Sequence, residues 1–163
     1  MSPHRIIWLE DRPDTITPLK IFCEREHFRV ELVSTPPAFY DKLCDSAGGI
    51  ALVVVDIMLY GVNDLSSIDM QDAYTDNGIN AGWIILQRLL RAAETDEKIR
   101  KIPVLVLSTK PQYGKEKALL DGIQMARKEG DGYVRYLEKA SGGWEDTFKE
   151  LILGLKTSKN ERG

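Results

Sequence analysis

Cysteine and histidine are scarce in this sequence, which has two of each among 163 residues. Neither Cys23 nor Cys44 belongs to a CxxC or Cys/His motif, which argues against a zinc site and against a disulfide framework. Both cysteines fall in segments with the apolar spacing of amphipathic helices. We therefore expect two buried free thiols that serve packing.

Long hydrophobic runs and an excess of basic residues are also lacking. The longest apolar runs, near 50–55 and 83–86, are much shorter than the roughly 20 residues of a membrane-spanning helix. The first residues include acids where a signal peptide has an apolar core. The formal net charge of −3 gives no electrostatic reason to bind nucleic acid. We therefore expect a cytoplasmic protein with neither membrane nor nucleic-acid partners.

Basic residues are missing from the middle of the chain, because no lysine or arginine occurs between Lys42 and Arg88 although several aspartates do. Within this stretch, residues 60–80 mix Gly, Asn, Ser and Asp without helical or strand periodicity. Loops of this length are uncommon in compact domains unless they are functional or mobile. We expect a long acidic loop here. The basic residues beyond it are expected to form a solvated helix end: Arg88, Arg91, Lys98, Arg100 and Lys101.

The pattern that is present alternates strands with helices. The predicted strands are 5–10, 30–33, 50–55, 102–107 and 133–137. The predicted helices are 14–26 with Asp14 as cap, a helix from Pro36 to before Gly48, then 79–90, 115–129 and 144–155. Such alternation predicts one parallel sheet with helices on both faces. We expect a single domain over 1–163, with its core in 5–155 and a frayed tail at 156–163.

Polar side chains stand where the predicted strands end. Asp56 closes the β-branched run ALVVVDIML at 51–59. The other strand ends carry Glu10-Asp11, Ser108-Thr109 and Lys139. The carboxyl ends of parallel strands meet at one edge of the sheet. Clustered carboxylates repel one another, and Mg²⁺ or a lysine offsets that charge. An aspartate beside such a metal can act as a nucleophile toward a phosphoryl group.

These motifs in this order resemble the receiver domain of two-component response regulators. The likeness rests on the acidic pair, VVVDIML, PVLVLST and YLEK, and spans 5–155. It implies a flavodoxin-like, doubly wound α/β fold of five parallel strands. It also implies that a histidine kinase or phosphotransfer protein phosphorylates Asp56, and that an unknown downstream protein reads the result. Apart from its own phosphorylation and dephosphorylation, such a domain is not an enzyme, and we expect no output domain after residue 155.

The resemblance also assigns roles to single residues. It implies that Mg²⁺ is held by Glu10, Asp11, Asp56 and the backbone carbonyl of Met58. Ser108 and Lys139 would contact the phosphoryl oxygens, with Thr109 as the alternative hydroxyl, and Tyr136 together with Ser108 would form the switch. Where the family has a proline after the lysine, this chain has Ala140.

Other interpretations are compatible with the same residues. An aspartate at a strand end is often only a turn residue, and Tyr136 could simply pack in the core, as Trp83 and Trp144 are expected to do. A degenerate receiver that binds partners without phosphorylation, with residues 60–80 covering Asp56, is one alternative. An aspartate-nucleophile phosphatase is a weaker one, because those enzymes need a second aspartate two residues on, where this chain has Met58.

Overall fold

The structure, a computed structural model, describes residues 4–46, 49–59, 65, 81–92, 94–109, 115–140 and 142–162. In these residues the strands form one sheet with the order β2-β1-β3-β4-β5. All of its pairings are parallel. The strands are β1 (His4–Leu9), β2 (Phe28–Val33), β3 (Ile50–Asp56), β4 (Val104–Ser108) and β5 (Val134–Glu138).

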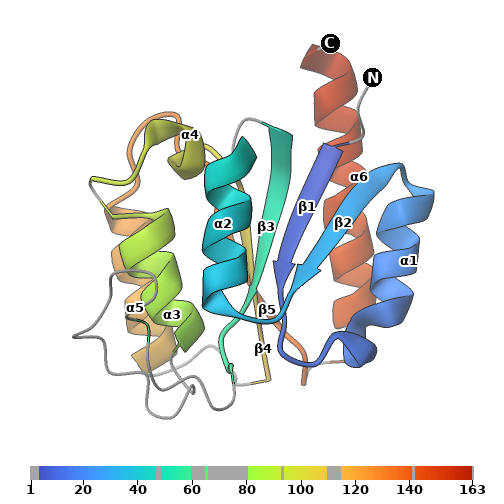
Figure 1. Cartoon of the computed structure of the whole chain (residues 1–163), viewed down its shortest axis with the longest axis horizontal. Helices are drawn as coiled ribbons and strands as arrows, with labels where there is room; N and C mark the ends of the chain where they lie inside the picture. Colours follow the sequence, from blue (N-terminus) through green and yellow to red (C-terminus); the bar gives the residue numbers. More distant parts are fainter. Residues whose placement is uncertain are drawn as a thin grey trace.

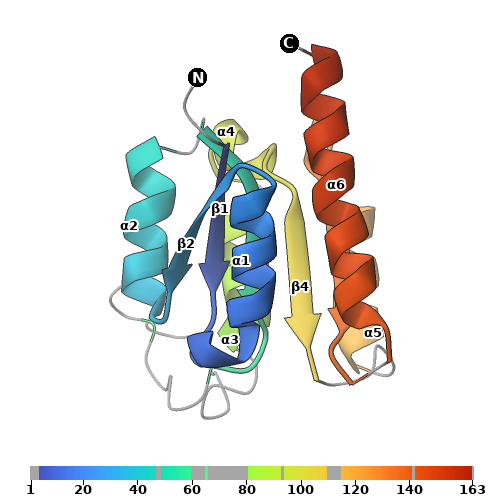
Figure 2. The same ribbon diagram turned by 90° about the vertical axis from the view of Figure 1, so that its right-hand side faces the viewer.

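Helices cover both faces of the sheet (Figures 1 and 2). Their bounds are η1 (Pro13–Ile16, a 3₁₀ turn), α1 (Thr17–Arg25), α2 (Pro36–Ser46), α3 (Ala81–Ile85), η4 (Leu86–Leu90, a π-helical turn), α4 (Glu97–Arg100), α5 (Lys115–Met125) and α6 (Trp144–Arg162). Residues of α1 and α6 contribute to one apolar core. Residues of α2, α3, η4 and α5 contribute to the other. The predicted doubly wound α/β fold is confirmed.

The sequence of β3 explains its central position. All of its residues are buried, and from Leu52 to Val55 they alternate between the two cores. A strand with apolar residues on both faces is stable only where helices cover both sides. The connections of β1 and β3 leave the sheet in opposite directions, because β2 lies beyond β1 and β4 lies beyond β3. The carboxyl ends of β1 and β3 therefore form the crevice in which this class of fold binds its ligands.

Several predicted boundaries are wrong. Asp14 does not cap the first helix, because the chain first makes the η1 turn and α1 begins at Thr17. The helix predicted over 115–129 ends at Met125 rather than Glu129. The tail predicted to fray continues α6 to Arg162, where an ion pair of 2.9 Å joins Lys156 Nζ to Glu26 Oε2. Helical propagation adds one backbone hydrogen bond per residue, so a polar sequence can extend a helix already fixed by packing.

The two cysteines differ in burial. Cys23 is fully buried in α1, as predicted, and burial raises the pKa of its thiol to about 12. Cys44 in α2 is exposed, so the prediction of two buried thiols is wrong for this residue. The apolar face of α2 instead consists of Phe39 and Leu43, which are both fully buried.

The prediction of a solvated basic helix end is wrong for Arg91 and Arg100, which are buried at the amino ends of β4 and β5. With Asp131 they form what we call the arginine cluster. Arg100 donates to both carboxylate oxygens of Asp131, at 3.1 and 2.6 Å. Arg91 donates to the carbonyl oxygens of Leu90 at 2.8 Å and of Ile102 at 2.5 Å. The carboxylate and the carbonyls provide the acceptors that a buried guanidinium requires.

Of the predicted acidic loop 60–80, only Leu65 lies within the described residues, and it is buried.

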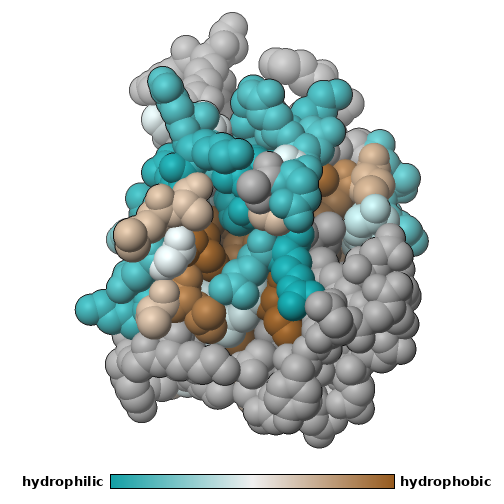
Figure 3. All heavy atoms as spheres, turned by 90° about the vertical axis from the view of Figure 1, so that its left-hand side faces the viewer, coloured by the Kyte–Doolittle hydropathy of each residue, from teal (hydrophilic) through white to brown (hydrophobic). Residues whose placement is uncertain are grey.

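Figure 3 shows the face that carries α3 and α5, where apolar atoms are visible in a hollow between polar ones. At the end of α5, Met125 is the most exposed large apolar side chain in the described part of the chain. None of the described helices combines the length and the apolar character needed to cross a membrane.

Candidate functional site

Asp56 is the last residue of β3 and is 7% exposed. The backbone N–H of Met58 donates to its Oδ1 at 3.1 Å. This Asx-type hydrogen bond is typical of an aspartate at the start of a turn, and it fixes the carboxylate at the sheet edge. The next residue, Ile57, donates its N–H to the carbonyl of Leu107 at 3.2 Å, so the turn stays attached to β4.

Glu10 and Asp11 follow β1, the neighbour of β3. Glu10 is 2% exposed, and its Oε1 accepts the backbone N–H of Arg12 at 3.1 Å. One carboxylate oxygen from each of Glu10, Asp11 and Asp56 lies within 4.8 Å of the others. The sequence prediction that these acids meet at one edge is therefore realised in the structure, as the parallel register requires.

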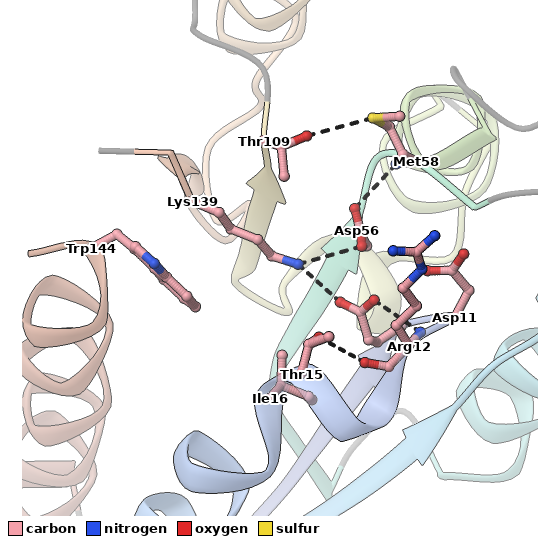
Figure 4. A pocket seen from close by; sticks show the side chains of 10 residues that line it. Asp11, Arg12, Thr15, Ile16, Asp56, Met58, Thr109, Lys139 and Trp144 are labelled. Carbon is pink, nitrogen blue, oxygen red and sulfur yellow. Dashed lines mark hydrogen bonds and ion pairs between the residues drawn. The ribbon is translucent and has the colours of Figure 1, made fainter. Parts of the chain in front are cut away.

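Lys139 reaches this group from the end of β5. Its backbone N–H donates to the carbonyl of Ser108 at 2.7 Å, which holds the residue beside the end of β4. Its Nζ lies 3.1 Å from Oε2 of Glu10 and 3.5 Å from Oδ2 of Asp56, as the dashed lines in Figure 4 show. We call these four residues the site cluster: Glu10, Asp11, Asp56 and Lys139.

The site cluster disfavours the ionised forms of its two buried carboxyl groups, Glu10 and Asp56. Burial and the charge of Asp56 raise the pKa of Glu10 to about 7, although Lys139 opposes the shift. Burial likewise raises the pKa of Asp56, against the attraction of Lys139. One ammonium does not compensate three adjacent carboxylates. In this arrangement Glu10 retains a proton up to nearly neutral pH.

The site cluster opens into a cavity of about 270 Å³. Figure 4 shows its lining, with Lys139 pointing toward Asp56 and Trp144 on the far side at the start of α6. The remaining lining residues are Arg12, Thr15, Ile16, Met58 and Thr109. The volume and the acidic side chains suit a phosphoryl group with a hydrated metal ion.

The donor set fits Mg²⁺. Carboxylate oxygens are the ligands that this ion prefers, and it commonly binds through one or two of them together with water and phosphate oxygens. Burial raises the pKa of both Glu10 and Asp56, and the charge of Asp56 adds to the shift of Glu10, so a divalent cation would stabilise the charged forms. Glu10, Asp11 and Asp56 would hold the ion. Met58, whose backbone carbonyl the receiver resemblance assigns to the metal, lines the same cavity.

Comparisons with known proteins bear on the fold. No family model matches the chain, and no curated protein does. Solved structures do match over nearly the whole length. A response regulator receiver domain protein (CheY-like) from Methanospirillum hungatei has a TM-score of 0.57 at 16% identity, covering 98% of this chain and 99% of that one. The fold is that of a CheY-like receiver domain.

Two further structures with this receiver fold are similarly distant in sequence. Vibrio cholerae chemotaxis protein CheY4 has a TM-score of 0.58 at 11% identity, covering 94% of this chain and 98% of that one. A response regulator from Thermotoga maritima has a TM-score of 0.55 at 17% identity, covering 95% and 98%. The resemblance inferred from the motifs is thus confirmed at the level of the fold, whereas the roles of single residues are not tested by these matches.

In this receiver fold the two candidate hydroxyls have different positions. Ser108, the predicted phosphate contact, is buried at the end of β4. The alternative, Thr109, is exposed and lines the cavity, where its Oγ1 donates to Sδ of Met58 at 3.6 Å. The sequence predicted that both residues lie near the site. Only the structure shows that Thr109, and not Ser108, lines the cavity.

Tyr136, the predicted switch residue, lies on β5 with a half-buried side chain that packs against the core of α2, α3 and α5. Its ring is stacked on Trp83 of α3, with centroids 6.1 Å apart and planes 13° from parallel. Trp83 itself is buried, as predicted, whereas Trp144 is half-buried and also lines the cavity.

Four lining residues were not predicted as part of the site: Arg12, Thr15, Ile16 and Trp144. Arg12 directly follows the acidic pair, and Figure 4 shows its guanidinium on the same side as the carboxylates of Asp11 and Asp56. Its position next to the pair was a signal that the sequence offered. Trp144 was assigned only to core packing, because its helical spacing with Phe148 concealed its place at the cavity mouth.

Proposed function

We propose that the chain is a phospho-acceptor signalling domain that takes a phosphoryl group on Asp56 from a histidine kinase or phosphotransfer protein. The observation that carries this proposal is the contact of one ammonium, Lys139 Nζ, with both Asp56 and Glu10 beside a 270 Å³ cavity. In this geometry a nucleophilic carboxylate, an acidic metal-binding pair and a cation face the same small volume.

The transfer is a displacement at phosphorus. A carboxylate oxygen of Asp56 attacks the phosphorus of a phosphohistidine, the P–N bond breaks, and its electron pair stays on the imidazole, which takes up a proton. Bound Mg²⁺ supplies charge neutralisation for the phosphoryl oxygens. Asp56 is held in place for the attack by the Met58 N–H, which occupies one carboxylate oxygen.

Lys139 has two roles in succession. Its ammonium lies closer to Glu10, at 3.1 Å, than to Asp56, at 3.5 Å. With Glu10 and Asp11 holding a cation, Lys139 would be available for a phosphoryl oxygen on Asp56. Charge-assisted hydrogen bonds of this type are roughly twice as strong as neutral ones.

The proposed output is a shift between two conformations of the domain that a protein partner reads. The chain would catalyse only its own phosphorylation and hydrolysis. The cytoplasmic location inferred from the sequence stays a prediction. The phosphatase alternative is not supported by the cavity, because the residue two positions after Asp56 is Met58, and its side chain offers no acid.

The direct experiment is incubation with Mg²⁺ and acetyl phosphate, followed by intact mass measurement. We expect stoichiometric phosphorylation that is lost in Asp56→Asn. Asp41→Asn, which changes an exposed aspartate of α2, is the matched control and keeps the modification.

The alternatives give other results in the same experiment. Absence of modification in the folded protein would support a phosphorylation-independent interaction module. Fast release of phosphate from acetyl phosphate, with many turnovers per chain, would support a phosphatase. Modification that persists in Asp56→Asn would remove Asp56 from its proposed role.

A further inference from the structure

Helix α3 begins in direct contact with the backbone of Asp56. The N–H of Gly82 donates to the carbonyl of Ile57 at 3.0 Å. A Cβ on Gly82 would stand 2.6 Å from Cα of Ile57 and would also overlap the carbonyl oxygen of Asp56. Only glycine permits an approach this close. A displacement of the Asp56–Ile57 backbone therefore cannot occur without moving the start of α3.

The residue after Gly82 makes the next contact. Trp83 is 2% exposed, and its indole is stacked on Tyr136 at 6.1 Å. The stack joins α3, which begins beside the end of β3, to β5, although β4 lies between β3 and β5 in the sheet. Aromatic rings packed in this way move together, because the interior leaves no free volume for one of them alone.

The stack is not an arrangement with all polar groups satisfied. Nε1 of Trp83 is buried, and no hydrogen-bond acceptor reaches it among the described residues. An orphaned buried N–H favours any alternative position in which the indole finds a partner. Trp83 thus has a reason to leave the stack when the start of α3 moves.

We propose that Trp83 is a positioning residue that clamps Tyr136 in the unphosphorylated state and releases it when the Asp56 backbone shifts. This inference rests on the proposed function, since phosphorylation of Asp56 is what displaces the backbone. It adds a second route to Tyr136, through Gly82 and α3, to the one through Ser108 that the receiver resemblance implies.

The three tryptophans allow both the function and this inference to be tested in one sample. With 5-fluorotryptophan incorporated, each indole gives its own ¹⁹F resonance, assigned by Trp→Phe substitution. Trp144 lines the cavity and reports occupancy of the site, Trp83 reports the clamp, and Trp8 lies in the opposite core against Phe148 and is the reference. The probe is Mg²⁺ with beryllofluoride, and Asp56→Asn is the negative control.

We expect the Trp83 and Trp144 resonances to move together, with Trp8 changing least, and both shifts to vanish in Asp56→Asn. Movement of Trp144 without Trp83 would overturn the clamp and leave the proposed function intact. No movement of either resonance would overturn the proposed function and the clamp with it.

Substitution provides a test that does not depend on the ligand. Gly82→Ala forces α3 away from the Asp56–Ile57 backbone and should shift the Trp83 resonance without beryllofluoride. Gly122→Ala in α5, where nothing lies within 4 Å of the added Cβ, is the matched control. A Trp83 resonance that is unchanged in folded Gly82→Ala would contradict the coupling.

The coupling must also be reciprocal. Trp83→Leu removes the clamp and should tighten beryllofluoride binding by about five- to tenfold, at the lower end of the usual range of coupling between sites. Phe39→Leu, another fully buried aromatic of the same core, should destabilise the fold without this gain in affinity. Equal affinities in the two variants would reduce Trp83 to ordinary packing and overturn the proposal.

Discussion

Two buried charge clusters lie at opposite ends of this sheet, and they are built in opposite ways. The site cluster, at the carboxyl ends of the strands, brings three carboxylates together, and its one ammonium contacts two of them. The arginine cluster, at the amino ends of β4 and β5, has two guanidiniums and one carboxylate, to which Arg100 donates while Arg91 donates to backbone carbonyls. Burial raises the pKa of Glu10 in the first cluster and lowers the pKa of Arg91 in the second to about 10, which still leaves Arg91 charged.

The difference lies in how the excess charge is treated. In the arginine cluster, backbone carbonyls accept the hydrogen bonds that Asp131 does not. Arg100, for example, also donates to the carbonyls of Arg91 and Ala92. Within this cluster, Nε of Arg91 is the one buried side-chain nitrogen without a hydrogen-bond partner among the described residues. In the site cluster, the backbone N–H of Arg12 donates to Glu10 and that of Met58 donates to Asp56. The excess charge of the arginine cluster is thus offset mainly by backbone carbonyls, whereas the excess negative charge of the site cluster is left for a cation to offset.

The largest expected effect is on the arginine cluster. Asp131→Ala leaves Arg100 buried without its carboxylate and should lower the free energy of unfolding by about 3–5 kcal/mol, measured by urea denaturation. Asp121→Ala, on the exposed face of α5, is the matched control. A loss for Asp131→Ala no greater than that of the control would show that the carbonyls alone hold the arginines.

Mg²⁺ should act only on the site cluster. At a concentration 100 times its Kd, a ligand of the folded state alone raises the free energy of unfolding by about 2.7 kcal/mol. We expect this gain in the unsubstituted chain and in Asp131→Asn, and its loss in Glu10→Gln, measured by thermal unfolding with and without Mg²⁺. Equal gains in all three would place the ion elsewhere.

Without Mg²⁺, the charge of Glu10 should be destabilising. Its pKa in the folded state, about 7, is above its ordinary value of 4.5. The folded state therefore binds the proton more tightly, and stability is full below pH 4.5 and falls as the pH rises toward 7. Glu10→Gln should remove this decline and raise the free energy of unfolding at pH 8 by about 1–3 kcal/mol.

The arginine cluster should respond to pH with the opposite sign. Hydrogen bonding to Arg100 lowers the pKa of Asp131, so its stabilising contribution is present above its ordinary pKa of 3.8 and is lost as the pH falls through the folded value. Comparison of Glu10→Gln and Asp131→Asn across pH 3–8 in urea denaturation separates the two contributions. A decline near neutral pH that survives in Glu10→Gln would assign it to another group.

The smallest expected effect concerns the two hydroxyls beside the site cluster. Ser108 stands at the position that the receiver resemblance assigns to the phosphoryl contact, and Ser108→Ala should slow phosphorylation by acetyl phosphate about tenfold, the equivalent of one hydrogen bond. The hydroxyl of Thr109 donates to Met58, so Thr109→Ala should slow phosphorylation less than Ser108→Ala does. If Thr109→Ala has the larger effect, the cavity-lining hydroxyl is the one that contacts phosphate.

The elements of the sheet were predictable because their signals are local. The β-branched run before Asp56 identified a doubly buried strand, and the polar residues at strand ends followed from parallel pairing. The helix ends were less predictable. The start of α1 depends on the η1 turn, and the end of α6 depends on a contact with Glu26 that is remote in sequence.

The sequence by itself determined the sheet, the acidic edge around Asp56 and the choice of Lys139 as its cation. Buried strands and the polar residues that end them are encoded by residues adjacent in the chain. Only the tertiary structure decided which of two adjacent hydroxyls lines the cavity, that Arg91 and Arg100 are buried, and that Trp83 stacks on Tyr136. These features depend on the packing of segments that are distant in the chain, which no local pattern records.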